Sequence, residues 1–423
     1  MRILISGASV AGPVLAYWLT RYGFEVTVVE RAPAPRKTGG GHAIDLFRPA
    51  MDIVEQMGLL EQVVAGKTGM ERLTVFREGA SRPVEVDLTR VMTAVSDRHV
   101  EIMRDDLSEI FYDATRHDAD YVFGDSVASI SADGEVVFDS GRAERFDLVV
   151  GADGLHSNVR RLVFGPESDY STWIGAYLAV VSMPGHLGLD GRMELVAGVG
   201  RMAGYGAAHM DDARAVFLFR TPEQLDYHHR DVPRQKELLR ERFAGVGRQV
   251  PRLLAELDRT PAFYFDSITQ LRLDSWSRGR VTLVGDAGYC PGPAVGGSTS
   301  LAVVGAYILA GELAAHGGDH TRAFPSYEAE IGEYARRSRE FAIGAAKRIV
   351  PGSRFDLWAI TQGVRLINHL PVALTRAAAK LNTKGVRLHD SIVLKDYSAF
   401  TRAPLGHAAA PPSPSTAPSR KGR

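Results

Sequence analysis

A glycine-bearing turn near the start of the chain constrains the fold more than any other feature. Arg2–Ile5 is a short apolar run, Gly7–Gly12 is the turn, and Val14–Tyr22 has an apolar helical pattern closed by Gly23. A second strand-like run, Glu25–Val29, follows at once. This order of strand, turn, helix and strand predicts the opening of a doubly wound α/β sheet, a Rossmann-like fold.

The turn has the spacing of a dinucleotide-binding motif, with Gly7 and Gly12 at the outer positions and Ser9 at the middle one. The first glycine permits the tight turn, the small middle residue lets backbone N–H groups approach a pyrophosphate, and the last permits close packing of helix on strand. Glu30 ends the second strand, where a carboxylate can accept from ribose hydroxyls. Because Glu30 would repel a 2′-phosphate, the pattern predicts bound NAD or FAD.

Two later strands also run into turns that carry an aspartate. Phe146–Val150 precedes Asp153, and Val281–Val284 precedes Asp286. We expect both strands to join the first two in one sheet, with the carboxylates at its carboxyl edge. There a carboxylate can accept from a ribityl hydroxyl, and the Gly- and Pro-rich loop after Asp286 can present N–H groups to a flavin ring.

The segment between these strands predicts a second α+β unit inserted into the first. Trp173–Met183, Met193–Val199 and Ala213–Arg220 are rich in strand-forming residues, and Arg234–Leu257 has helical periodicity. The pattern after Ala315 is helical. The last residues are too poor in large apolar side chains to order themselves.

Composition excludes several function classes. Lys plus Arg and Asp plus Glu number 50 each, so no net charge attracts nucleic acid or an anionic membrane. The single cysteine, Cys290, excludes an intrachain disulfide and fits a reducing, cytoplasmic compartment. Leu301–Ala315 is too short an apolar stretch to span a bilayer, so we expect a buried helix and neither a membrane nor a nucleic-acid partner.

In this order, the motifs resemble those of the class A FAD-dependent aromatic monooxygenases, the para-hydroxybenzoate hydroxylase superfamily. Glu101–Leu107, Asp153–Gly154 and Gly285–Asp286 carry the likeness together with the glycine turn. Gly41–Leu46 and Leu301–Leu313 are especially similar to the branch of tetracycline-inactivating and polyketide-tailoring monooxygenases.

This resemblance implies a Rossmann-like FAD-binding domain with an inserted mixed β-sheet substrate domain and a C-terminal bridging helix. The implied ranges are 1–171 and 273–345 for the two parts of the FAD-binding domain, 172–272 for the substrate domain, 346–398 for the C-terminal helical region and 399–423 for a disordered tail. FAD would be the cofactor, NADPH or NADH a transient reductant, and O2 and an aromatic small molecule the other partners.

The resemblance also assigns residues to the cofactor. Those expected to bind or surround it are Gly7, Ser9, Ala11, Gly12, Glu30, Arg31, Asp45, Arg104, Asp153, Gly154, Arg160, Asp286, Pro293, Gly296, Gly297, Ser298 and Thr299. Ser298 and Ser300 stand where the family usually has glycine and asparagine, which alters the geometry of the ring pocket.

Substrate contacts are expected from His42 and from four aromatic residues of the inserted strands, Tyr177, Tyr205, Phe217 and Phe219. These aromatics alternate with small or polar residues, which fits either a half-buried sheet or the lining of a pocket. His156 is expected to cap the turn after Gly154, and no metal site is expected.

The implied activity is monooxygenation through a flavin hydroperoxide, which passes one oxygen atom to an aromatic or polycyclic small molecule. Hydroxylation is the expected reaction, and Baeyer–Villiger insertion or epoxidation stays open. No catalytic side chain is expected because the chemistry belongs to the cofactor. Cys290 lies in the cofactor loop but has no evident base. A flavin-binding protein without turnover is the alternative that Ser298 and Ser300 leave open.

Overall fold

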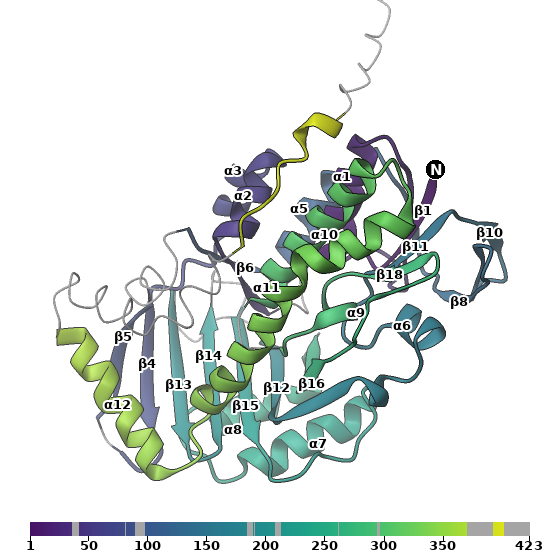
Figure 1. Cartoon of the computed structure of the whole chain (residues 1–423). Coiled ribbons are helices and arrows are strands. Elements are labelled where there is room, and N and C mark those ends of the chain that lie inside the picture. The colour runs from purple at the N-terminus through teal and green to yellow at the C-terminus, as the bar shows by residue number, and fades with distance from the viewer. Residues whose placement is uncertain are drawn as a thin grey trace, which may run out of the picture.

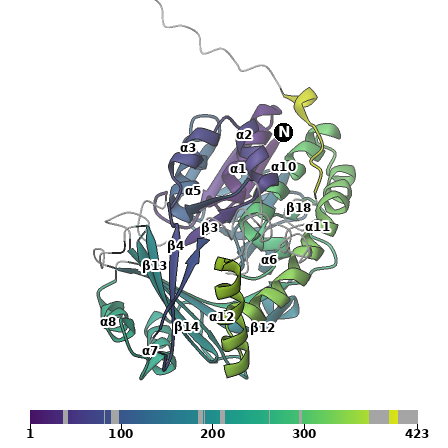
Figure 2. The same cartoon turned by 90° about the vertical axis from the view of Figure 1, so that its left-hand side faces the viewer.

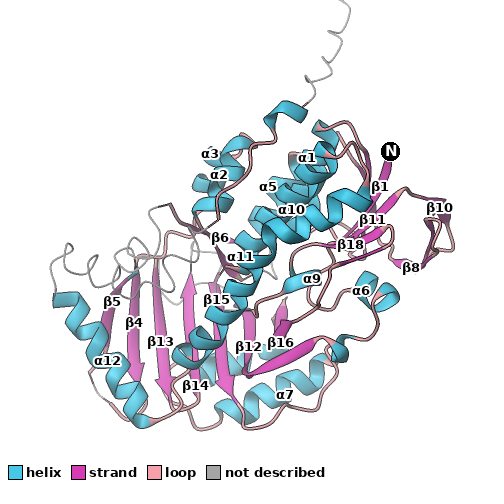
Figure 3. Cartoon of the chain, in the orientation of Figure 1, coloured by secondary structure: helices cyan, strands magenta, loops and turns pink. Residues whose placement is uncertain are grey.

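The fold has two units joined by a long helix, α11 (His320–Ile349), which crosses from one to the other (Figure 1). The computed structural model describes residues 1–35, 42–80, 82–88, 98–183, 189, 191–207, 213–260, 262–293, 297–369 and 392–401. Helices cluster in the upper unit of Figure 3, and a broad sheet dominates the lower one.

The first unit is built on a six-stranded sheet in the order β17-β18-β11-β1-β2-β7. Its strands are β1 (Arg2–Ser6), β2 (Glu25–Glu30), β7 (Asp120–Phe123), β11 (Leu148–Gly151), β17 (Ser277–Arg278) and β18 (Val281–Leu283). β1 pairs in parallel with β2 and β11, and β11 pairs in parallel with β18. The prediction that strands from three distant regions share one sheet is confirmed. Ile3, Leu4 and Ile5 have no exposed surface, as is typical of parallel strands covered on both faces.

Helices and a small sheet complete this unit. They are α1 (Ala11–Arg21), α2 (Arg48–Gln56), α3 (Leu60–Ala65), α5 (Arg104–Asp113), α6 (Asn158–Val163), α9 (Asp286–Tyr289), α10 (Ser298–Ala315), η1 (Glu167–Asp169), β8 (Val127–Ile130), β9 (Glu135–Phe138) and β10 (Ala143–Arg145). Within the described residues, one helix, α10, is long and apolar enough to cross a membrane, but 78% of it is buried in the fold. It packs against α1, α2 and α11, so the expectation of a buried core helix is confirmed.

The second unit is a seven-stranded mixed sheet in the order β16-β12-β15-β14-β13-β4-β5. Its strands are β4 (Arg72–Arg77), β5 (Val84–Asp87), β12 (Ser171–Met183), β13 (Arg192–Gly198), β14 (Arg201–Ala207), β15 (Ala213–Arg220) and β16 (Phe263–Leu271). β4 pairs in parallel with β13, whereas the other pairs of this sheet are antiparallel. Because β4 and β5 come from residues 72–87, the sheet draws on chain outside 172–272.

The two faces of this sheet bury different side chains. Tyr177, Phe217 and Phe219 pack on one face with Leu239 of α7 (Val232–Phe243) and Leu253 of α8 (Val250–Ala255). The predicted helical stretch is thus divided into α7, α8 and the short η2 (Glu256–Asp258). Residues one position away along the strands point to the opposite face, toward the first unit.

The end of the chain returns to the first unit. α11 contacts both α10 and β12, which makes it the helix that bridges the units, and α12 (Arg354–His369) lies against β5 and β13 (Figure 2). The described residues 392–401 include η3 (Ser398–Phe400) and place Tyr397 on α10, where a Cβ at Gly311 would lie 2.2 Å from the Tyr397 ring. Residues 370–391 and most of the predicted tail fall outside the described residues.

Candidate functional site

Two cavities meet between the units. The edge cavity, about 400 Å³, lies at the carboxyl edge of the parallel sheet, and the intersheet cavity, about 290 Å³, lies between a short two-stranded sheet and the seven-stranded one. The short sheet pairs β3 (Ala43–Leu46) with β6 (Val100–Met103). His42, Ile44, Ser298 and Thr299 line both cavities, so the two spaces share a junction.

Most of the residues predicted to contact the cofactor line the edge cavity. These are Gly7, Ser9, Ala11, Glu30, Arg31, Arg104, Asp153, Gly154, Asp286, Pro293, Ser298 and Thr299. Gly12 and Arg160 are not on this cavity, Asp45 and Gly297 line the intersheet cavity instead, and Gly296 lies outside the described residues. The fold therefore gathers three distant segments around one elongated space, and the individual binding roles stay predictions.

The glycine turn holds α1 tightly against the sheet. Gly7 has φ +111°, and a Cβ there would lie 2.4 Å from the Ala152 carbonyl oxygen. A Cβ at Gly12 would lie 1.9 Å from the Gly7 oxygen. These glycines are thus required by backbone packing. Val10 precedes the first turn of α1 without a side-chain cap, which leaves N–H groups of the helix available to an anion.

A cation lies beside this helix terminus. Nε and Nη2 of Arg104 lie 3.3 and 3.2 Å from the Ser9 hydroxyl oxygen. Uncapped helical N–H groups, a small hydroxyl and a guanidinium form a donor set that suits a pyrophosphate. The residues present therefore fit the phosphate part of a dinucleotide.

Glu30 lies beside the glycine turn and lines the same cavity. One carboxylate oxygen accepts from the Ala8 N–H and the other from the Ala32 N–H, each at 2.9 Å. Each oxygen keeps a lone pair beyond these bonds, so both can accept from ribose hydroxyls. The side chain therefore holds the glycine turn in place and still suits the predicted ribose contact.

The two strand-end aspartates differ in their partners. Asp153 accepts from the Ser157 hydroxyl, from Asn158 N–H at 2.8 Å and from Val159 N–H at 3.1 Å, so it closes the turn before α6. Asp286 begins α9, and burial raises the pKa of its carboxyl, partly offset by Cys290 and the charge of Arg104. A partly buried carboxylate on the cavity wall is suited to receive hydroxyl donors from a ligand.

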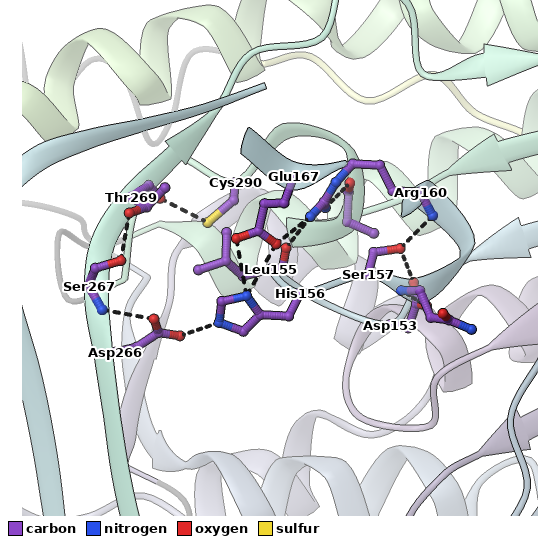
Figure 4. A network of polar contacts seen from close by, with 12 residues as sticks. Asp153, Leu155, His156, Ser157, Arg160, Glu167, Asp266, Ser267, Thr269 and Cys290 are labelled. Carbon is purple, nitrogen blue, oxygen red and sulfur yellow. Dashed lines mark hydrogen bonds and ion pairs between the residues drawn. The ribbon is translucent and has the colours of Figure 1, made fainter. Parts of the chain in front are cut away.

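Cys290 is buried, and burial raises the pKa of its thiol well above the ordinary value. Its Sγ lies 3.8 Å from the Thr269 carbonyl oxygen, which it can reach as a weak donor (Figure 4). A neutral buried thiol is a poor nucleophile. Burial of the thiol therefore disfavours covalent chemistry at Cys290.

Arg160 binds neighbouring loops together. Its side chain is 1% exposed and donates to the Ala287 carbonyl at 2.8 Å and to the Glu167 carboxylate at 2.7 Å (Figure 4). It also donates to the Leu155 carbonyl. All of these partners belong to the protein, and they hold the segment after β11 against α9. Arg160 does not line the edge cavity, and its cofactor role stays a prediction.

His156 joins the two units rather than capping its own turn. Its ring nitrogens lie 3.1 Å from Glu167 and 3.0 Å from Asp266 of β16 (Figure 4). Burial would lower the pKa of His156, but the hydrogen bonds and charges of these carboxylates outweigh it and raise the pKa to about 10. Ser157 caps α6 instead, by accepting from the Arg160 N–H at 3.0 Å.

The intersheet cavity has an apolar wall and a polar wall. Leu178, Val180, Met193, Gly206, Val216 and Leu218 form the first on the seven-stranded sheet, and Ala43, Asp45, Glu101 and Met103 form the second on the β3–β6 sheet. Thr68, Met70, Leu88, Arg214 and Gly297 also line it. An apolar space with a few polar groups on one side is typical of a small-molecule site.

Of the expected substrate contacts, His42 alone lines this cavity. Tyr177, Tyr205, Phe217 and Phe219 belong to the core on the other face of the sheet, and the Tyr177 hydroxyl oxygen accepts from the Leu225 N–H at 2.7 Å. The structure differs from the pocket-lining interpretation because side chains alternate along a strand, and a shift of one residue changes the face. These four aromatic residues fit the alternative interpretation, in which they pack on the buried face of the sheet.

Sequence reasoning missed several residues of the site. Glu101, Thr68 and Arg214 line the intersheet cavity, and Tyr264 and Asp266 line the edge cavity. The sequence contained a signal for Asp266, since a carboxylate in the middle of a strand that is largely buried needs a polar partner. Glu101 lies within the Glu101–Leu107 motif, but the direction in which its side chain points depends on how β6 pairs with β3.

Ser300 has a structural partner. Its hydroxyl oxygen accepts from the Phe47 N–H at 3.0 Å, which ties the first turn of α10 to the end of β3. Ser298 lines both cavities. The two serines that depart from the family pattern therefore lie at the junction of the cavities. Ser300 holds α10 against the end of β3, and Ser298 lines the cavities.

Comparisons with known proteins are consistent with this arrangement. The FAD binding domain family matches residues 1–342. An uncharacterised protein of Mycobacterium tuberculosis is 44% identical over 343 residues, covering 80% of this chain and 91% of its own length. A flavin-dependent monooxygenase of Legionella longbeachae is 37% identical over 347 residues, covering 81% and 88%.

Solved structures give the same result. The tetracycline destructase Tet(55) superposes with a TM-score of 0.79 at 33% identity, covering 93% of this chain and 98% of its own. Tet(51) superposes with a TM-score of 0.78 at 31% identity, covering 94% and 98%. Klebsiella pneumoniae HpxO complexed with FAD and uric acid shares the fold, with a TM-score of 0.68 at 22% identity and coverage of 91% and 97%.

Proposed function

Because this chain belongs to the family of FAD-dependent monooxygenases whose FAD-binding domain it shares, we propose that it uses NAD(P)H and O2 to hydroxylate an aromatic or polycyclic small molecule. FAD is its cofactor. The observation that carries the proposal is the junction of the two cavities at His42, Ile44, Ser298 and Thr299. A cofactor held along the edge cavity can there meet a molecule in the intersheet cavity.

The edge cavity supplies a group for each part of FAD. Glu30 would hold the adenosine ribose, and Ser9, Arg104 and the first turn of α1 would hold the pyrophosphate. Asp286 would accept from the ribityl chain. When bound, the flavin supplies the activation of O2 and the transfer of one oxygen atom.

The protein's own task is to position the substrate and to exclude water. Leu178, Val180, Val216 and Leu218 form an apolar wall facing the junction, which disfavours water beside the reacting groups. α10 begins at Ser298, so its positive N-terminal end points at the junction and favours negative charge developing there. No acid or base from the protein is required for this role.

NAD(P)H oxidation and O2 uptake by the purified yellow protein test the proposal. Both should accelerate when an accepted aromatic compound is added, and the product should gain one oxygen atom by mass spectrometry. Since the similar structures include tetracycline destructases, a tetracycline is a suitable first compound. A yellow protein that oxidises NADPH at one low rate with every aromatic tested would instead be a flavin-binding protein without this turnover.

The mass and connectivity of the product also separate the remaining reactions. A phenol product supports hydroxylation, whereas a lactone or an epoxide would mean Baeyer–Villiger insertion or epoxidation on the same scaffold. We also propose a cytoplasmic location, which cell fractionation tests. The choice between NADPH and NADH follows from the ratio of their kcat/KM values.

A further inference from the structure

Two carboxylates face each other across the β3–β6 sheet. Asp45 pairs in register with Glu101, and both line the intersheet cavity. The neighbouring pair on the same face, Ala43 and Met103, lines it too, whereas Ile102 has no exposed surface. Like charges directly opposite each other destabilise an antiparallel pair. The interaction of the two acids with each other therefore does not explain their positions.

Each carboxylate has one hydrogen-bond partner among the described residues. His99 Nε2 lies 2.7 Å from Oδ1 of Asp45, and the Thr68 hydroxyl donates to Oε2 of Glu101. Within the described part of the chain, no hydrogen bond reaches Oδ2 of Asp45 or Oε1 of Glu101. Burial and the nearby charge of Asp45 raise the pKa of the Glu101 carboxyl, partly offset by the hydrogen bond from Thr68.

His42 adds a third polar group at the junction. Its imidazole is partly buried, its ring centroid lies 5.6 Å from that of Tyr264, and it has no hydrogen-bond partner among the described residues. Burial and the nearby charge of Arg104 lower the pKa of His42 to about 4. At neutral pH the ring is therefore uncharged, with one nitrogen that accepts and one that donates.

The opposite wall is apolar and adaptable. A Cβ at Gly206 would lie 2.4 Å from the Met70 methyl carbon, and a Cβ at Gly204 would lie 2.6 Å from that of Met193. The glycines thus leave room for two flexible thioether side chains, which can adjust to ring systems of different outline. A space of about 290 Å³ with such a wall suits a small molecule of a few fused rings.

We propose that the wall formed by His42, Asp45 and Glu101 binds a hydrogen-bond-donating edge of the substrate. The enzyme then selects polycyclic molecules with hydroxyl or amino groups along one edge and holds their apolar face against β12 and β15. This inference rests on the proposed function and specifies its substrate class. An acidic edge would be repelled by Asp45 and Glu101 and would be drawn to Arg214, which also lines the cavity.

Binding of three matched naphthalenes to the FAD-loaded protein, without NADPH, tests the proposal. The probes are 2,3-dihydroxynaphthalene, 2,3-dimethoxynaphthalene and naphthalene-2-carboxylate, and the readout is the change in flavin absorption on titration. The wild-type protein should bind the diol at least about tenfold more tightly than either other probe, as expected for charge-assisted hydrogen bonds. Failure of all three to bind would overturn the proposal, as would binding of the carboxylate as tight as that of the diol.

The variant Glu101→Gln tests whether Glu101 causes the preference for the diol. It should weaken diol binding about tenfold and leave the dimethoxy compound unchanged, because one acceptor is replaced by a neutral amide. The matched control is Glu85→Gln, since Glu85 also accepts from a threonine, Thr74 at 2.9 Å, but lies on β5 away from the cavity lining. Equal weakening of both probes by Glu101→Gln, or no change in the preference, would overturn the assignment.

Asp45→Asn serves as a second variant if Glu101→Gln does not fold or does not retain FAD, and the same loss of preference is expected. Since no turnover occurs in these titrations, the two proposals can fail separately. A protein that prefers the diol but never couples O2 uptake to an aromatic would retain the polar wall and lose monooxygenation. A protein that hydroxylates aromatics but binds 2,3-dihydroxynaphthalene and 2,3-dimethoxynaphthalene equally would support monooxygenation and contradict the polar wall.

Discussion

The edge cavity and the intersheet cavity differ in how the chain builds them. The edge cavity collects residues at the ends of β1, β2, β11 and β18, so position along each strand decides which side chains reach it. The intersheet cavity collects residues from the faces of two sheets, so the alternation of side chains along each strand decides which of them reach it. The residues of the edge cavity can be predicted from their spacing in the sequence. The residues of the intersheet cavity depend on which face of each strand meets the other unit.

The largest expected effect is on the turn that builds the edge cavity. Gly12→Val should abolish the stable folded protein, at a cost of about 5 kcal/mol, because the new Cβ would lie 1.9 Å from the Gly7 carbonyl oxygen. Gly332→Ala is the matched helix control, since a Cβ at Gly332 meets nothing within 4 Å. The control should raise stability by about 0.5–1 kcal/mol. Thermal unfolding and retained flavin measure both, and a fully folded, yellow Gly12→Val protein would contradict this account of the turn.

The faces of β15 can be separated with two neighbouring substitutions. Phe217→Ala should lower the free energy of unfolding by about 3–5 kcal/mol, because Phe217 packs in the core with Phe243, and should leave probe affinity in the surviving folded fraction unchanged. Val216→Phe should weaken binding of 2,3-dihydroxynaphthalene about tenfold by filling the intersheet cavity. Denaturant titration and flavin absorption give the two readouts. If Phe217→Ala weakened probe binding and Val216→Phe lowered stability instead, the assignment of the two faces of β15 would be wrong.

The two strand-end aspartates provide a comparison within the edge cavity. Asp286→Ala should weaken FAD binding by about 1.5–3 kcal/mol, because the acceptor proposed for the ribityl chain is lost. Asp153→Ala should lower the melting temperature instead, at a cost of about 1 kcal/mol, by removing the acceptor of the Asn158 and Val159 N–H groups at the start of α6. The flavin-to-protein absorbance ratio after gel filtration measures the first. Full flavin occupancy in Asp286→Ala would contradict the predicted contact.

The smallest expected effect concerns the contact between the units. His156→Gln should lower stability by about 1 kcal/mol near neutral pH, a value reduced because solvent screens the partly exposed ion pairs. The pKa of His156 is raised from 6.5 to about 10, so its contribution is complete below about pH 6.5 and is lost as the pH rises through about 10. The pKa of Glu167 is lowered from 4.5, so the contribution also fades as this carboxylate protonates in acid.

Urea unfolding of wild-type and His156→Gln protein at several pH values measures this difference. The gap between the two proteins should narrow toward pH 10. His117→Gln, at an exposed position, is the control and should show no such trend. A gap that widens with rising pH would mean that His156 is neutral in the folded protein.

Much of the edge cavity could be predicted because its residues lie next to strand ends and turns. Glu30, Asp286 and the glycine turn needed only the order of strand and turn, since parallel strands end at one edge. Arg160 was harder, because nothing in its spacing tells whether a guanidinium meets a ligand or the Ala287 carbonyl. His156 was likewise assigned to its own turn, although its partner Asp266 lies 110 residues away.

By itself, the sequence determined that four strand segments pair in parallel in one sheet, that α10 is a core helix, and that most of the predicted cofactor residues gather at the carboxyl edge. Tertiary structure alone decided which face of β12 and β15 meets the first unit, and it set Asp45 opposite Glu101. The physical reason is the range of the forces involved. Turn geometry and helical packing act over a few neighbouring residues, whereas the facing of two sheets is decided by burial summed over side chains from distant parts of the chain.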